Sequence, residues 1–155
     1  MTEYHSASSA RSVSASDAGA ALLRVTLGLL LLSHGLLKIY VFTVPGTVAF
    51  FSGLGLPPVA AYLTIFGEVA GGLALLSGVL TRLAAGLSLP ILLGAVWAHS
   101  ANGWVFSNQG GGWEFPALLA ALAVIVAVQG AGAFALGPVL SRLGRLEAVV
   151  PLWAR

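Results

Sequence analysis

Residues 57–80 read PPVAAYLTIFGEVAGGLALLSGVL and carry a single charged side chain, Glu68, near the middle. A helix that crosses a bilayer needs about 20 apolar residues, so this stretch predicts a membrane-spanning helix. A carboxylate near the bilayer midplane costs about 2.5–3.5 kcal/mol on insertion scales. We therefore expect Glu68 to face protein or a wet cavity and to have a partner. Small residues that would let another helix approach recur along the same stretch, at Gly67, Gly71, Ala74 and Gly78.

The composition of the whole chain is typical of a membrane protein. Of its 155 residues, 58% are hydrophobic and 8% are charged, against about 25% charged in soluble domains. So few charges cannot cover a soluble surface, and lipid must cover most of it. The six arginines and Lys38 are scattered, which argues against a nucleic-acid partner. The absence of cysteine excludes disulfides, thiolate metal sites and thiol redox chemistry by this chain.

Three further apolar stretches predict an all-α integral membrane protein with four transmembrane helices. The spans are expected at residues 19–40, 58–80, 83–100 and 115–136. Between the first two spans, residues 45–52 are apolar but too short to cross the bilayer, and proline and glycine flank them. They predict a short interfacial or re-entrant helix in the first outer loop.

The two ends of the chain differ from this membrane domain, which we place at residues 18–138. Residues 1–17 are polar, aperiodic and rich in serine and alanine, and they predict a disordered tail. The apolar run that follows ends in His and Lys rather than in a small-residue cleavage site, so we expect an uncleaved first span. Residues 139–155 repeat an apolar residue every three positions with arginines between them, which predicts a basic amphipathic helix on the membrane surface.

The placement of the arginines predicts the orientation of the bundle. Arg11 and Arg24 precede or begin the first span, Arg82 lies in the turn after the second, and the remaining three lie in the C-terminal tail. The other two loops hold only Lys38. The positive-inside rule then places both termini in the cytoplasm. We expect Arg24 to snorkel to the interface and, like Arg82, to anchor this topology.

With this orientation, all four helices contribute polar side chains to the outer half of the bundle. His34 and Lys38 lie one turn apart near the outer end of the first span, His99 ends the third, and Glu114 begins the fourth. Glu68 lies about 15 Å inward, at 1.5 Å per residue. The inner half is expected to be almost purely apolar. Ligand sites in helix bundles are built from facing helices in this way.

A plainer role is open for each candidate residue. Glu68 could be a structural acid paired with Lys38 or with a protonated histidine, and His34 could bond a backbone carbonyl. Glu114 could complement the dipole of its own helix, and Trp113 could belong to the outer aromatic belt. No metal or haem is expected, because the spans lack a Glu-x-x-His motif and the histidines lie near the rim.

Short patterns along residues 20–136 resemble those of the DoxX family in their order and spacing. They are Arg24-x-x-x-Gly28, His34-Gly35-x-x-Lys38, Gly53-Leu54-Gly55-Leu56-Pro57, Glu68-x-x-Gly71-Gly72, Gly78-x-x-Thr81-Arg82-x-Ala84-Ala85, His99, and Gly111-Gly112-Trp113-Glu114. The resemblance implies a four-helix inner-membrane protein of bacteria or archaea. It also implies kinship with the membrane subunit of thiosulfate:quinone oxidoreductase. The acid that often follows the family's last span is missing here.

We therefore expect a membrane subunit of a quinone-linked oxidoreductase system that binds a quinone head group in the outer half of the bundle. Glu68 and His34 would act as the catalytic residues, because each can exchange protons. The ligand-binding residues would be Lys38, which could stabilise the anion of a reduced quinone, together with His99, Glu114 and Trp113. A soluble or membrane redox partner is expected to supply electrons or substrate.

Two functions of other classes stay open. A non-enzymatic scaffold that anchors a redox or detoxifying complex would dock through the C-terminal helix and the Phe50-Phe51 segment. A small-solute or proton carrier would use Glu68 as its coupling acid. Four spans are few for a carrier unless the protein forms a homo-oligomer, and the sequence shows no inverted repeat.

Overall fold

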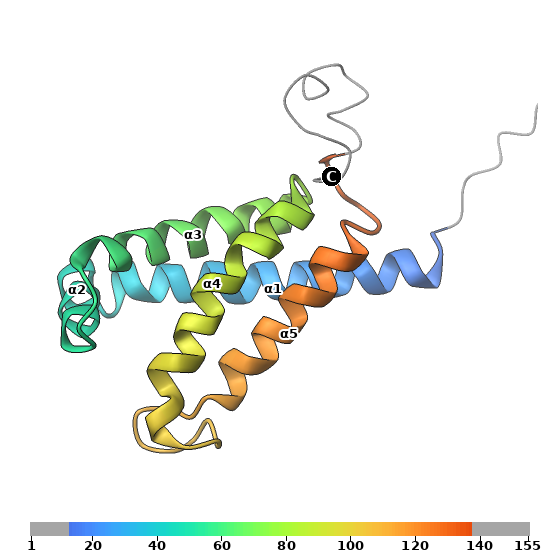
Figure 1. The fold of residues 1–155 in the computed structure, drawn as a ribbon. Helices are drawn as coiled ribbons and strands as arrows, with labels where there is room; N and C mark the ends of the chain where they lie inside the picture. The colour runs from blue at the N-terminus through green and yellow to red at the C-terminus, as the bar shows by residue number, and fades with distance from the viewer. Residues whose placement is uncertain (1–12, 138–155) are drawn as a thin grey trace, which may run out of the picture.

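The computed structural model describes residues 13–137, and within them all regular elements are helices and none is a strand (Figure 1). The prediction of an all-α protein is confirmed. The helices are α1 (Ala15–Tyr40), α2 (Val44–Gly53), α3 (Pro58–Ser77), α4 (Thr81–His99), the short 3-10 helix η1 (Ser100–Asn102) and α5 (Glu114–Gln129). The predicted amphipathic helix at 139–155 and most of the predicted N-terminal tail lie outside the described residues.

Three helices are long and apolar enough to cross a membrane: α1, α3, and α4 continued through η1. The fourth helix, α5, has 16 residues and is about 24 Å long at 1.5 Å per residue, less than the roughly 30 Å of a bilayer core. The predicted fourth span, residues 115–136, is therefore helical only as far as Gln129. The helix ends at Gln129 rather than at residue 136, because Gly130 turns the chain with a φ of +88°.

The first helix begins earlier than the sequence pattern indicates. The Ser14 hydroxyl accepts a hydrogen bond from the Asp17 backbone N–H at 3.1 Å and donates one to the Asp17 carboxylate at 2.7 Å. A side-chain acceptor at this position satisfies an N–H group that the first helical turn leaves free. The last residues of the predicted disordered tail are thus the cap and first turn of α1.

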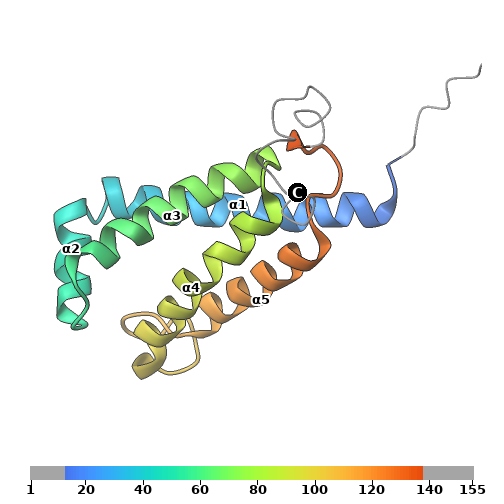
Figure 2. The same ribbon diagram turned by 45° about the horizontal axis from the view of Figure 1, so that its top comes forward.

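The helices are arranged as two pairs, α1 with α3 and α4 with α5 (Figures 1 and 2). In both views the pairs lie close together near the α3–α4 turn and diverge toward α2 and the α4–α5 loop. A buried core of leucine, alanine and valine joins them, including Leu27, Leu75, Ala85, Ala123 and Val126. A cavity lies between the two pairs and is lined by residues of α1, α3, α4 and α5.

The closest approach of α1 and α3 involves glycines other than those predicted. A Cβ atom on Gly72 would lie 2.7 Å from the Leu32 backbone nitrogen and 2.9 Å from the Gly28 carbonyl oxygen. Within the predicted row, by contrast, Gly71 faces open space and Gly67 faces Ile91 of α4. Small residues do permit the close approach, as expected, but α3 is rotated so that Gly72 meets α1.

The half of the bundle that was expected to be almost purely apolar contains Arg24. This side chain is 1% exposed and donates hydrogen bonds to four backbone carbonyl oxygens, those of Leu75, Leu76, Ala131 and Ala133, at 2.7–3.1 Å. The prediction that Arg24 snorkels to the interface is wrong. The last carbonyls of a helix lack intrahelical partners, and the five N–H donors of a guanidinium match such a group of acceptors. Arg24 thereby joins α1, the end of α3 and the segment after α5.

Candidate functional site

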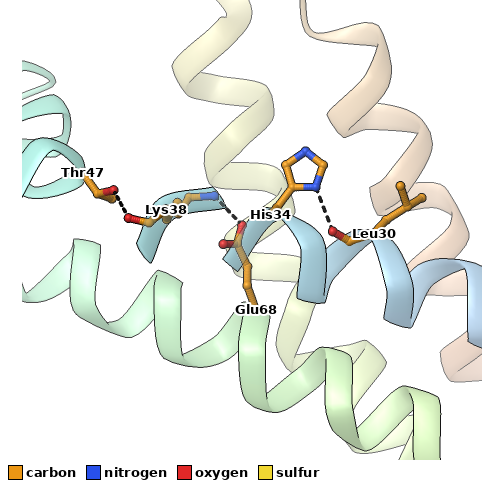
Figure 3. A network of polar contacts seen from close by, with 5 residues as sticks. All are labelled: Leu30, His34, Lys38, Thr47 and Glu68. Atoms are coloured by element: carbon orange, nitrogen blue, oxygen red, sulfur yellow. Dashed lines mark hydrogen bonds and ion pairs between the residues drawn. The ribbon is translucent and has the colours of Figure 1, made fainter. Parts of the chain in front are cut away.

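The centre of the candidate site is an ion pair between α1 and α3. Lys38 Nζ lies 2.8 Å from Glu68 Oε1, and the two side chains are 18% and 7% exposed (Figure 3). The Thr47 hydroxyl of α2 donates to the Lys38 backbone carbonyl at 3.2 Å, which ties α2 to this end of α1. Glu68 thus has the basic partner that burial of a carboxylate requires.

The second carboxylate oxygen of Glu68 is left without a partner. Oε2 is buried and accepts no hydrogen bond from any described residue. Buried polar atoms are nearly always bonded, and one that is not loses about 1–3 kcal/mol of solvation without compensation. Oε2 is therefore a place where a donor group of a bound molecule, or a water, would be stabilised.

His34 lies one turn before Lys38 on the same face of α1. Its Nδ1 lies 2.8 Å from the Leu30 carbonyl oxygen (Figure 3). Because a carbonyl can only accept, Nδ1 carries the hydrogen, and Nε2 of the neutral ring is left as an acceptor. The ring stacks on Phe115 of α5, with centroids 5.9 Å apart and planes inclined by 29°.

His99 has the same arrangement at the end of α4. Its Nδ1 lies 3.0 Å from the Gly110 carbonyl oxygen and 3.2 Å from that of Gly111. The Asn102 side-chain amide donates to the same two oxygens at 3.0 and 2.9 Å. The hydrogen on Nδ1 is therefore directed at the α4–α5 loop, and Nε2 of the neutral His99 ring is again left as an acceptor.

Two cavities meet at this group of side chains. The first, of about 260 Å³, lies between the helix pairs and is lined by His34, Phe115 and apolar residues of α1, α4 and α5. The second, of about 250 Å³, lies against α2 and is lined mainly by apolar residues, including Phe50 and Phe51. Both cavities share one wall, made of Lys38, Glu68, Ile91, Ala95 and His99. Each of the two cavities is slightly smaller than the range of about 300–1,000 Å³ that small-molecule sites occupy.

The sequence of α4 explains why space remains there. Gly94, Ala95 and Ala98 present little or no side chain to the second cavity, and Pro90 interrupts the backbone hydrogen bonding inside the helix. Facing them on α3 are the small side chains of Ala60 and Thr64. A helix with larger residues at these positions would close the gap between α3 and α4.

The sequence matches the family described as DoxX over residues 19–101. The chain belongs to the DoxX family.

A relative of this DoxX protein occurs in Bacillus subtilis (strain 168) under the name "Putative oxidoreductase CatD". The two sequences are 32% identical over 122 residues, which cover 79% of this chain and 87% of the relative. No solved structure matches the chain at comparable significance. Family membership and the three long apolar helices identify a membrane protein in contact with the lipid bilayer.

Four of the six predicted site residues of this DoxX protein come together. His34, Lys38, Glu68 and His99 all line the first cavity, and the last three also line the second. They come from α1, α3 and α4, so the helix packing, not nearness in sequence, assembles the group.

Glu114 and Trp113, the other two predicted residues, line neither of these cavities. Glu114 Oε1 accepts a hydrogen bond from the Phe106 backbone N–H at 3.0 Å. Trp113 packs edge-on against Trp104, with ring centroids 4.4 Å apart. Because the chain folds back between residues 103 and 114, both side chains meet the α4–α5 loop instead of the cavity. Both side chains therefore contact that loop, and their ligand-binding role stays a prediction.

The structure adds Phe106 and Phe115 to the site, which the sequence analysis missed. Phe115 packs on His34 although α1 and α5 are distant in sequence, and no local pattern signals such a contact. Thr47 was missed as well, although a polar residue buried in the apolar helix α2 was a detectable signal. Within residues 13–137, no group of three or more His, Asp and Glu side chains has the arrangement of a metal site.

Proposed function

We propose that this DoxX protein binds a quinone head group in the first cavity and serves as the membrane subunit of a quinone-linked oxidoreductase system. The observation that carries the proposal is Glu68 Oε2, a buried acceptor without a partner beside the charged Lys38. Pockets for organic ligands are mostly apolar, with a few convergent polar groups that set orientation. The first cavity has this character, with His34, Lys38, Glu68 and His99 as the polar groups.

The shape and lining of the two cavities suit an amphiphilic aromatic ligand. A flat ring would occupy the first cavity beside Phe115 and the His34 ring. An apolar tail would pass the shared wall into the second cavity, where Phe50, Phe51 and other apolar residues would cover it. Burial of a tail in such surroundings contributes about 0.8 kcal/mol per CH₂ group.

The polar side chains would manage the protons of the reaction. Reduction of a bound quinone consumes two electrons and two protons. Glu68 Oε2 and the Nε2 atoms of the histidines are bare acceptors, so each would first take up a proton from solvent before passing it to the reduced quinone. Lys38 holds Glu68 in position and keeps N–H groups to offer to a ligand oxygen, because its contact with Oε1 uses one of its three donors.

A partner oxidoreductase would supply the electrons. The name of the Bacillus relative supports a redox role for this family branch. In this scheme the chain contributes the site inside the membrane, and the partner contributes the substrate oxidised. Loss of the partner should leave ligand binding intact while stopping the reaction.

We further propose an inner-membrane protein with four crossings and both termini in the cytoplasm. Arg24 and Arg82 lie at the end of the bundle that holds the α3–α4 turn, and Lys38 lies toward the opposite end. The positive-inside rule then places the α3–α4 turn on the cytoplasmic side. In this orientation α5 would complete the fourth crossing together with the chain after Gly130. Helix α2 would lie at the outer interface, and both cavities would lie in the outer half of the membrane.

The proposal is tested by identifying what co-purifies with the protein. The protein is purified in mild detergent, and its organic extract is analysed by mass spectrometry. The variant Ala95→Phe places a ring at the wall shared by both cavities and should remove the quinone found with the wild type. Ala121→Phe is the matched control, because the same ring is added on the exposed face of α5.

Near-stoichiometric quinone in the wild type and in Ala121→Phe, and its loss in Ala95→Phe, is the expected result. The absence of quinone from every sample, after the membranes of the same cells are shown to contain it, would refute the proposal. In that case the scaffold function would be the next to test, by asking whether deletion of residues 139–155 releases a partner protein.

A further inference from the structure

We infer that the first cavity binds the reduced, hydroxyl-bearing form of its aromatic ligand more tightly than the oxidised, carbonyl-bearing form. The inference rests on the proposed function, since it specifies which form of the quinone couple the site favours. It follows from the donors and acceptors of the four polar side chains that line the cavity, His34, Lys38, Glu68 and His99.

Both histidines line the cavity, and each has one ring nitrogen left as an acceptor. The Nδ1 hydrogen of His34 is taken by the Leu30 carbonyl at 2.8 Å, and that of His99 by the carbonyls of Gly110 and Gly111 at 3.0 and 3.2 Å. These backbone oxygens can only accept, so they set the tautomer of each neutral ring. Only the bare Nε2 atom of each ring is then left for a ligand.

Glu68 adds a third acceptor, and Lys38 is the one donor. Lys38 occupies Oε1 of the carboxylate at 2.8 Å, and Oε2 is buried with no donor among the described residues. Of the four polar side chains around this cavity, only Lys38 has N–H groups left to give. The cavity is therefore rich in acceptors and poor in donors.

The two forms of a quinone couple match this set differently. The two carbonyl oxygens of a quinone only accept, so they can pair with Lys38 but leave Glu68 Oε2 and the histidine Nε2 atoms without partners. The two hydroxyls of the reduced form each donate a hydrogen and still accept from Lys38. Each buried acceptor that gains a partner contributes about one factor of ten in affinity. We expect the reduced form to bind about tenfold to a hundredfold more tightly.

Such a preference would alter the energetics of the bound couple. Tighter binding of the reduced form raises the reduction potential of the couple, by about 30 mV for each factor of ten when two electrons are transferred. The bound quinone would then accept electrons from a weaker reductant than the free quinone could. This places the site on the quinone-reducing side of its reaction, with a partner oxidoreductase as the electron donor.

The test is a binding comparison under anaerobic conditions with wild-type protein in lipid nanodiscs. The probes are a fully substituted benzoquinone with a short alkyl tail, its hydroquinone, and the dimethyl ether of that hydroquinone. The ether keeps the ring and tail of the reduced form but has no hydrogen to donate. Calorimetric titration is expected to give the lowest dissociation constant for the hydroquinone, with the quinone and the ether at least about tenfold weaker.

Variants then assign the preference to the named atoms. In Glu68→Gln the amide nitrogen can take the place of Oε2 and turn an acceptor into a donor. This change should weaken hydroquinone binding about tenfold, and quinone binding should stay the same or tighten. In His34→Phe an aromatic ring is kept beside Phe115 and Nε2 is lost, so only hydroquinone binding should fall. Tyr62→Phe, on the exposed face of α3, is the control and should change neither.

The outcomes separate this inference from the proposed function. If quinone and hydroquinone bind with equal affinity, or if the ether binds as well as the hydroquinone, the inference is overturned while the site remains a quinone site. If the preference persists in Glu68→Gln and His34→Phe, the acceptors named here are not its source. If none of the three probes binds, the proposed function itself fails.

Discussion

Replacement of Lys38 by methionine is expected to destabilise the protein by about 3–5 kcal/mol, the range for loss of one partner of a buried ion pair. Methionine keeps most of the length of the lysine side chain but removes its charge. The gross attraction across the 2.8 Å contact is about 6 kcal/mol at an effective dielectric constant of 20. Glu68 left alone would take up a proton rather than stay charged, so we expect a value at the lower end.

Removal of the other partner, in Glu68→Leu, is expected to lower the free energy of unfolding by less than Lys38→Met does. Lys38 is more exposed than Glu68, 18% against 7%, and lies near the end of α1. A lysine in this position can extend its ammonium group toward water. The double variant Lys38→Met/Glu68→Leu removes both charges and should lie within about 1 kcal/mol of the wild type, since apolar replacements of a buried pair are often neutral.

The assay is the free energy of unfolding of ligand-free protein in bicelles, measured for all four members of this double-mutant cycle. The cycle isolates the coupling between the two side chains from their separate contributions. Our view that Lys38 and Glu68 form a buried, coupled ion pair would be refuted by two results together. These are a loss of less than about 1 kcal/mol of unfolding free energy in Lys38→Met, and additive effects of the two changes in the double variant. Lys38 and Glu68 would then behave as a solvated surface pair, and the ion pair would not explain how a carboxylate is tolerated in α3.

Two further changes test the packing of the bundle. Arg24→Leu should cost several kcal/mol in unfolding free energy, because it removes the donor to the carbonyls of Leu76, Ala131 and Ala133, at about 1–3 kcal/mol each. Arg82→Leu, at an exposed arginine with one bond of 3.4 Å, should cost less than about 1 kcal/mol. Equal effects would contradict the hydrogen bonding described for Arg24. Gly72→Ala should cost about 1–3 kcal/mol because its Cβ would lie 2.7 Å from the Leu32 nitrogen, whereas Gly71→Ala next to it meets open space and should be neutral or stabilising. A thermal or denaturant series on the two glycine variants that showed no difference would mean that α1 and α3 are not packed at Gly72.

The helices and the membrane character of this protein follow from the sequence alone. Stretches of about 20 apolar residues form helices in lipid whatever their neighbours are, because backbone groups must be bonded within the segment. For the same reason, the burial of Glu68 and its need for a basic partner were predictable from one charge in a long apolar run. The polar set His34, Lys38, Glu68 and His99 was predictable as a group, because the helix connectivity brings these residues to one end of the bundle.

The details of the site depended on tertiary structure. Lys38 and His34 lie one turn apart, and the sequence allows either of them to pair with Glu68. The rotation of α3 against α1 at Gly72 brings Lys38 Nζ to 2.8 Å from Glu68 Oε1. The burial of Arg24 depended on carbonyls from α3 and from residues 131–133, which only the folded chain assembles. Glu114 and Trp113 contact the α4–α5 loop, because residues 103–114 fold back on themselves. Apolar length is a local property of the sequence, whereas the choice of a partner depends on the rotation and divergence of helices, which packing between distant segments decides.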